Sequence, residues 1–107
     1  RMSSTIYHMF LQKEAIKMFK LKTVNGENNI TGKRLTAIRH QKGISQRQLA
    51  KNLQLLGYDV DHHFIRRIEN GERFVTDIEL VALSRVLNVK IEELIDITIP
   101  IFSSLME

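Results

Sequence analysis

The sequence GISQRQLAKNLQLLGYDVDHHFIRRIENGER, residues 43–73, contains the signals on which the fold prediction depends. Near its start, Ser45 followed by Gln48 three residues later predicts a helix that opens with a capping box. Three leucines then follow at helical spacing and predict one buried stripe: Leu49, Leu53 and Leu56. Gly57 predicts the end of this helix, because glycine adopts the left-handed backbone conformation at little cost.

A second helix is predicted over about 62–70, and its signals are independent of the first. Asp61 is a residue type that caps helix N-termini, and Gly71 marks the other end. Ile65 and Ile68 are three residues apart and predict the buried face. The polar residues of this helix are therefore expected on its outer face.

Outside this stretch the chain is predicted to be helical on both sides, which gives an all-α fold. Thr76 with Glu79 predicts a capping box for a helix that Asn88 ends, and Gly43 is expected to end the helix before the central stretch. The further predicted elements are helices at about 5–21, 32–42 and 90–95, and a short strand or extended arm in the Ile-rich tail. We divide the chain into an N-terminal helical extension (1–31), a folded domain (32–96) and a C-terminal tail (97–107).

The length and composition indicate one small globular domain. The 107 residues include no cysteine, which excludes a disulfide framework and fits a reducing, cytoplasmic location. Neither a membrane span nor a secretory signal is recognisable in the sequence. The charge is uneven: residues 33–73 carry nine basic and four acidic side chains, whereas 74–107 carry two basic and six acidic ones. A basic centre favours a polyanionic partner.

The central stretch resembles the phage-repressor/Cro-like helix-turn-helix family, often called the XRE family. The matching pieces are GISQ (43–46), QLA (48–50) and IRRIENG (65–71), followed by VTDIELVALSRVLNV (75–89). The resemblance covers roughly residues 32–95. It implies a lambda-repressor-like five-helix domain that binds double-stranded DNA as a homodimer and represses or activates transcription, with repression favoured.

Four side chains are expected to read DNA bases, because they lie toward the outer face or the N-terminal end of the second helix. They are His62, His63, Arg66 and Arg67. An α-helix fits the major groove, where arginine pairs with guanine and histidine can donate or accept a hydrogen bond. The alternative is that these side chains form an ordinary solvated face.

Further roles follow from the resemblance. Phosphate contacts are expected from Gln46, Arg47, Asn70 and Arg73, and the first of these lies at a helix N-terminus that favours anions. In similar proteins the positions of Arg39 and Glu69 form an internal salt bridge, which would orient the reading helix without touching DNA.

Two departures from the family pattern stand out. The connection between the two helices, around residues 54–59, is longer by about five residues. Phe64 replaces the small polar residue that is common there, and it either packs into the enlarged turn against Tyr58 or contacts a thymine methyl group; we favour packing. The adjacent pair His62 and His63 does not favour a metal site, because neighbouring side chains on a helix diverge.

The remaining sequence leaves several alternatives open. The first 31 residues could dock on this chain or a second subunit, lie on a membrane surface, or be partly disordered, and docking is favoured by the broad apolar circumference of the predicted helix. No catalytic motif or cofactor-binding loop is recognisable, so no enzyme activity is expected. Alternative functions are an antitoxin that binds a toxin, a protein-interaction module and, least favoured, an RNA binder. An effector would be another protein or a ligand of a small pocket.

Overall fold

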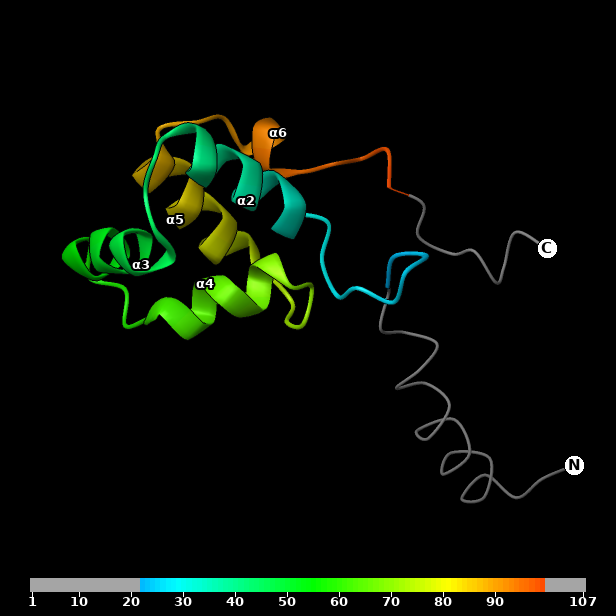
Figure 1. Cartoon of the computed structure of the whole chain (residues 1–107), viewed down its shortest axis with the longest axis horizontal. Helices are drawn as coiled ribbons and strands as arrows, with labels where there is room; N and C mark the ends of the chain where they lie inside the picture. Colours follow the sequence, from blue (N-terminus) through cyan, green and yellow to red (C-terminus); the bar gives the residue numbers. More distant parts are fainter. Residues whose placement is uncertain (1–21, 100–107) are drawn as a thin grey trace, which may run out of the picture.

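The computed structural model describes residues 22–99, so the predicted helix at 5–21 and the end of the tail lie outside the described residues. The described chain folds into five helices, shown in Figure 1. They are α2 (Gly32–Gln41), α3 (Gln46–Leu55), α4 (His62–Glu69), α5 (Asp77–Leu87) and α6 (Ile91–Leu94). Residues 22–99 contain no strand, and this arrangement confirms the predicted all-α, five-helix class.

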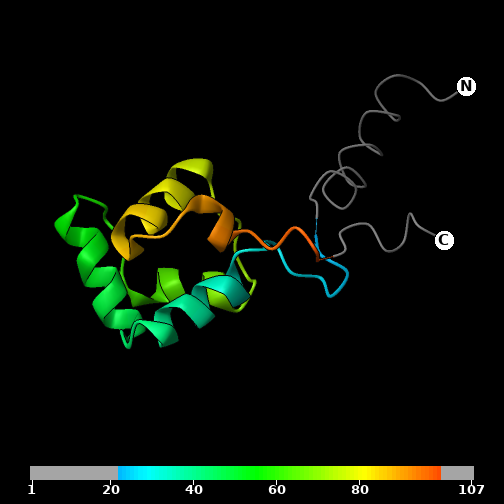
Figure 2. The ribbon, with the colours of Figure 1, turned by 90° about the horizontal axis from the view of Figure 1, so that it is seen from above.

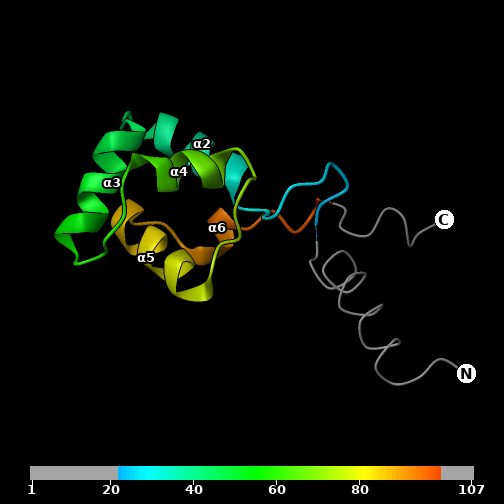
Figure 3. The same ribbon diagram turned by 90° about the horizontal axis from the view of Figure 1, so that it is seen from below.

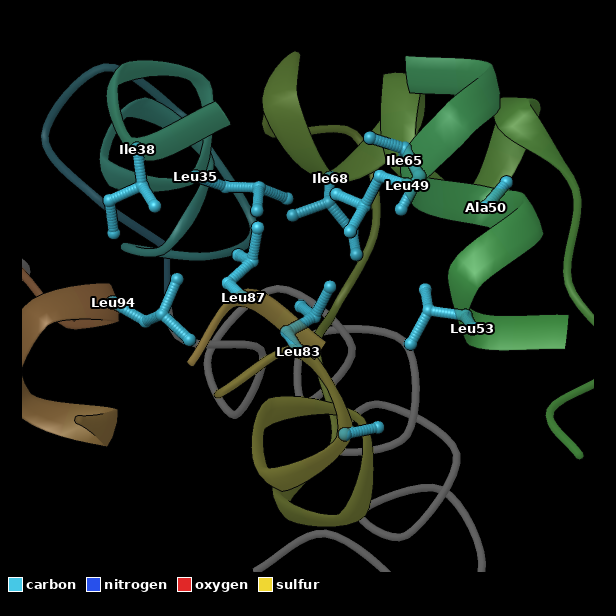
Figure 4. Close-up of a cluster of buried hydrophobic side chains, with 11 residues drawn as sticks. Leu35, Ile38, Leu49, Ala50, Leu53, Ile65, Ile68, Leu83, Leu87 and Leu94 are labelled. Carbon is cyan, nitrogen blue, oxygen red and sulfur yellow. The ribbon is translucent and has the colours of Figure 1, made fainter. Parts of the chain in front are cut away.

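The helices pack as a ring: α2 on α4, α4 on α3, α3 on α5, α5 on α6 and α6 on α2. Figures 2 and 3 show α2 and α4 on one side, α5 and α6 on the opposite side, and α3 across one end. Every helix supplies side chains to the core between them (Figure 4). The buried apolar set is Leu35, Ile38, Leu49, Ala50, Leu53, Ile65, Ile68, Ala82, Leu83, Leu87 and Leu94. Burying one leucine or isoleucine stabilises the fold by about 1.5–3 kcal/mol.

Two helix starts are capped as the sequence predicts. The Asp61 carboxylate accepts hydrogen bonds from the backbone N–H groups of His63 (3.0 Å) and Phe64 (3.3 Å) at the start of α4. Thr76 and Glu79 form both bonds of a capping box at the start of α5. These bonds satisfy backbone donors that a helix cannot satisfy itself.

The capping box predicted for α3 is only half formed. The Ser45 hydroxyl accepts from the Gln48 backbone N–H at 3.0 Å, as expected. The Gln48 side chain, however, donates to the Asn52 side-chain oxygen at 2.8 Å instead of returning to Ser45. Side chains four residues apart lie on one helix face, and this exposed pair forms the alternative bond.

Two other sequence predictions are wrong in detail. Leu56 was expected in the buried stripe, but α3 ends at Leu55 and the Leu56 side chain is 55% exposed, just before Gly57 turns the chain with φ +95°. Residues 97–99, expected to begin a strand, form a turn in which the Asp96 carboxylate accepts from the Thr98 backbone N–H at 3.0 Å. Such local side-chain bonds compete with regular structure.

Candidate nucleic-acid interface

Helix α4 has one face fixed in the core and the opposite face open. Ile65 and Ile68 are fully buried, and Figure 1 shows the helix along one edge of the molecule. The four predicted base-reading residues lie on the remaining surface: His63, Arg66 and Arg67 are exposed and His62 is half-buried. A short, core-anchored helix thus presents polar side chains to the outside.

Three of these side chains form a cluster that runs from the start of α4 to its last turn. The His62 and His63 ring centroids are 4.1 Å apart, and Arg66 Nη2 lies 3.4 Å from His63 Nδ1. Partial desolvation, followed by the electrostatic influence of Arg47 and His63, lowers the pKa of His62 below its usual value. The lower pKa favours the neutral imidazole, which offers one hydrogen-bond donor and one acceptor.

Arg67 makes no hydrogen bond with the described side chains of this cluster, although its side chain and that of His63 border the same groove. Its side chain lines a surface groove of about 600 Å³ beside the α3–α4 connection. Within residues 22–99 no hydrogen bond or ion pair engages the Arg67 guanidinium, which leaves all its donors available. Carboxylates of Asp59, Asp61 and Glu79 line the groove together with the guanidinium groups of Arg67 and Arg73, so the groove carries charges of both signs.

The ion pair that the resemblance implies is present and buried. Arg39, at the end of α2, donates from Nε to Glu69 Oε2 at 2.8 Å and from Nη2 to Glu69 Oε1 at 2.9 Å. Its Nη1 donates to the Ile44 carbonyl oxygen at 3.0 Å. The two charged side chains are only 10% and 6% exposed. This bidentate geometry is the stronger form of a charged pair, and it ties α2 to the last residue of α4.

Gln46 joins the same carboxylate from a third helix. Its Nε2 donates to Glu69 Oε1 at 2.9 Å from the first residue of α3. Burial opposes ionisation of Glu69, but the hydrogen bonds from Arg39 and Gln46 outweigh it and hold the pKa of Glu69 below its usual value. The Gln46 amide has a second N–H that this contact does not use. One carboxylate therefore connects α2, α3 and α4.

The four predicted phosphate contacts have different surroundings. Arg47 is exposed on the first turn of α3, and Asn70 is exposed directly after α4. Asn70 donates to the Glu72 carboxylate at a long 3.4 Å, and the Arg66–Glu72 pair nearby is also long at 3.9 Å. Exposed pairs of this kind contribute little to stability and separate easily.

Arg73 is committed to contacts within the fold. Its Nη2 donates to both Glu79 oxygens at 2.9 and 3.2 Å, its Nε donates to the Phe74 carbonyl oxygen at 3.0 Å, and its guanidinium carbon lies 4.5 Å from the Phe64 ring centre. Phe64 and Tyr58 are both partly buried against the core. Because Arg73 links α5 to Phe64, we leave it out of the interface proposed below.

The sequence analysis did not identify the residues that contact the C-terminal end of α4. Asn28 and Asn29, placed in the extension by sequence, donate to backbone carbonyl oxygens at and after the end of α4. Two asparagines shortly before the Thr31-Gly32 helix start are a recognisable capping signal. Nothing in the sequence pattern indicates that they also reach residues about 40 positions away.

In the described part of the chain no helix is long and apolar enough to cross a membrane. The same residues contain no group of three or more histidine, aspartate or glutamate side chains arranged to hold a metal ion.

The α3–connection–α4 unit, with the first helix supporting a second whose outer face is polar, defines a helix-turn-helix protein. The chain belongs to the helix-turn-helix family of the XRE type, whose family model matches residues 35–94, more than half its length.

The solved structures that are similar to this chain include a restriction-modification controller protein and a DNA-binding domain. The restriction-modification controller protein C.AhdI from Aeromonas hydrophila is 30% identical over 60% of this chain and 86% of its own, with a TM-score of 0.53. The DNA-binding domain of BldD is 28% identical over 64% of this chain and 92% of its own, with a TM-score of 0.54. No curated protein sequence matches the chain significantly.

Proposed function

We propose that this protein is a sequence-specific regulator of transcription that binds duplex DNA and represses the genes it controls. The observation that carries the proposal is the outer face of α4, where His62, His63, Arg66 and Arg67 are gathered on a helix anchored in the core. Membership of the helix-turn-helix family supports it, as does the similarity to a controller protein and to a DNA-binding domain.

In this proposal α4 enters the major groove, which is about 12 Å wide and accepts a helix. Arg67 is the strongest candidate for a bidentate contact with guanine, because its guanidinium is not engaged within residues 22–99. His62 and His63 offer hydrogen-bonding groups to adjacent base edges, and Arg66 reads a base once it leaves its long contact with Glu72.

Phosphate contacts would flank α4. The free N–H of the Gln46 amide and the backbone N–H groups of Gln46 and Arg47 suit a phosphate, since a helix N-terminus attracts anions. Arg47 adds a positive charge beside them, and Asn70 offers its amide at the other end of α4. These contacts would set the register of the protein on DNA and leave the choice of sequence to α4.

We further propose that the protein acts as a homodimer in the cytoplasm and has no catalytic role. A helix of eight residues reaches few base pairs, and a two-fold dimer doubles the number that is read. Two α4 helices about 34 Å apart would match half-sites one turn of DNA apart.

The test is selection of bound sequences from random duplex DNA at two salt concentrations, followed by a reporter assay. We expect enrichment of a palindrome, an affinity that falls steeply with salt, and repression when the palindrome lies within a promoter. No enrichment at either salt concentration would contradict DNA recognition and favour the protein-interaction alternative. Activation of the reporter would contradict repression alone.

A further inference from the structure

We infer that Asn29 is a positioning residue for the reading helix, so that discrimination between DNA sequences depends on a side chain outside the family match at 35–94. The inference rests on the proposed function. Asn29 lies before α2 and far from the four base-reading residues in sequence, but its amide joins the end of α4 to the start of α2.

The contact between the end of α4 and the start of α2 is a joint in which the Asn29 side chain uses all of its hydrogen-bonding capacity. Its Nδ2 donates to the Ile68 carbonyl oxygen at 3.1 Å and to the Arg73 carbonyl oxygen at 2.9 Å. Its Oδ1 accepts from the backbone N–H groups of Thr31 (3.0 Å) and Gly32 (2.8 Å). An amide offers two donors and two main acceptor positions, and here each has a partner.

Asn28 extends the connection along the same loop. Its backbone N–H donates to the Gly71 carbonyl oxygen at 2.8 Å, and its Nδ2 donates to the Glu72 carbonyl oxygen at 3.0 Å. The last carbonyl groups of a helix have no partner within the helix. The segment before α2 therefore supplies donors to four carbonyl oxygens at and after the end of α4.

The close approach of the two helices depends on Gly32. A Cβ atom at this position would lie 2.3 Å from the Ile68 carbonyl oxygen and 3.1 Å from that of Glu69. Contacts that short require the backbone to move. The absence of a side chain thus lets the start of α2 sit directly against the last turn of α4, where Asn29 bridges the two.

This joint should affect recognition more than simple affinity. The N-terminal end of α4 is held by the Asp61 cap and its middle by Ile65 and Ile68 in the core. Its C-terminal end is held by Glu69 and by the Asn29 amide. Base hydrogen bonds weaken steeply with misalignment, whereas the attraction of basic side chains to phosphates tolerates small shifts. A displaced helix end would therefore reduce sequence discrimination first.

The experiment compares three full-length variants with the wild-type protein on the selected palindrome and on a scrambled duplex. Asn29→Ala removes the whole joint, whereas Asn29→Asp keeps the acceptor for Thr31 and Gly32 but replaces the donor that binds Ile68 and Arg73. Asn25→Ala is the matched control, because Asn25 is exposed and its side chain makes no hydrogen bond within residues 22–99. Circular dichroism sets a temperature at which each protein is folded.

We expect both Asn29 variants to lose about tenfold in the ratio of palindrome to scrambled affinity, equivalent to about 1.4 kcal/mol. Affinity for scrambled DNA and its salt dependence should change little, and Asn25→Ala should match the wild type. If Asn29→Ala does not fold, Asn28→Ala, which removes only the side-chain bond to Glu72, takes its place with an expected loss of about threefold.

Equal losses on both duplexes would contradict the inference, because they would indicate fewer active molecules and not a misplaced helix. Full discrimination by Asn29→Asp would contradict it as well, because the α2 cap alone would then suffice. Either result leaves the proposed function intact. Failure of the wild-type protein to select any sequence would overturn the proposed function and this inference together.

Discussion

At the scale of single residues, Glu69 connects three helices beneath the proposed interface. Its carboxylate accepts from Arg39 on α2 and from Gln46 on α3 while lying at the end of α4. The first residue of α3, a candidate phosphate contact, is thereby connected to the helix proposed to read bases. A change at Glu69 would disturb recognition without removing any group that touches DNA.

Glu69 should also make the folded protein sensitive to acid. Because its folded-state pKa is lowered, the associated stability is present above the ordinary value of about 4.3 and is lost as the pH falls through the lower folded-state value. Glu69→Gln leaves Arg39 buried without a counter-charge and should cost about 3–5 kcal/mol at pH 7. Chemical denaturation from pH 7 to pH 3 measures both effects.

Glu69→Gln should lose less unfolding free energy between pH 7 and pH 3 than the wild-type protein, because glutamine cannot be protonated in this range. The half-exposed Glu72→Gln is the control, and it should retain the wild-type stability and pH profile. A wild-type loss of stability below pH 4.3 that persists unchanged in Glu69→Gln would contradict this role.

Arg67→Ala should weaken binding to the selected palindrome by about 1–3 kcal/mol and relax the preference at one base pair of each half-site. The reason is that a bidentate contact with guanine discriminates against the other bases. Repeated selection with the variant measures the preference position by position. Arg85→Ala, which removes an exposed charge from α5, is the control. A uniform loss on all sequences would contradict base reading by Arg67.

The sequence predicted the residues of α4 better than it predicted their partners. The outward position of Arg66 and Arg67 follows from the spacing of Ile65 and Ile68, which is local information. The engagement of Arg73 with Glu79, in contrast, depends on how α5 packs, and no local pattern contains that arrangement. The same holds for Asn29, whose partners are about 40 residues away.

At the scale of elements, the start of α4 should depend on its cap. Asp61→Ala removes the carboxylate that accepts from the His63 and Phe64 N–H groups, and it should cost about 0.5–2 kcal/mol of unfolding free energy. Asp59→Ala is the matched control, because Asp59 is exposed two residues earlier and its side chain makes no hydrogen bond in the described region. Urea denaturation of both variants measures the difference, and equal stabilities would contradict the capping role.

The predicted helix positions agree with α2 to α6 because caps and apolar spacing are local signals. Two of the wrong predictions concern side chains that can form a hydrogen bond with more than one partner. Gln48 bonds to Asn52 instead of completing a box, and Asp96 forms a turn where alternating isoleucines favoured a strand. Leu56 continues the apolar spacing of α3, yet the helix ends one residue earlier and leaves it exposed.

At the scale of the whole molecule, the uneven charge predicts how binding responds to salt. Residues 33–73 carry a net charge of +5, whereas 74–107 carry −4, so one region should face DNA and release counterions on binding. Arg47→Ala should weaken binding to all sequences alike and reduce the slope of log affinity against log salt by about 1. Titrations at several salt concentrations measure the slope. A sequence-dependent loss with an unchanged slope would show that Arg47 does not act through phosphate.

The close fit around Gly32 and Asn29 has a consequence for transplanting specificity between proteins. When the exposed residues of α4 are exchanged for those of another family member, the host protein still sets the orientation of the helix. In this protein that orientation depends partly on the segment before α2. A graft that carries only residues 62–69 into a foreign scaffold would leave behind the donors to the Ile68 and Arg73 carbonyl groups. The portable unit is therefore discontinuous in sequence, and it includes residues 28–32 together with 62–73.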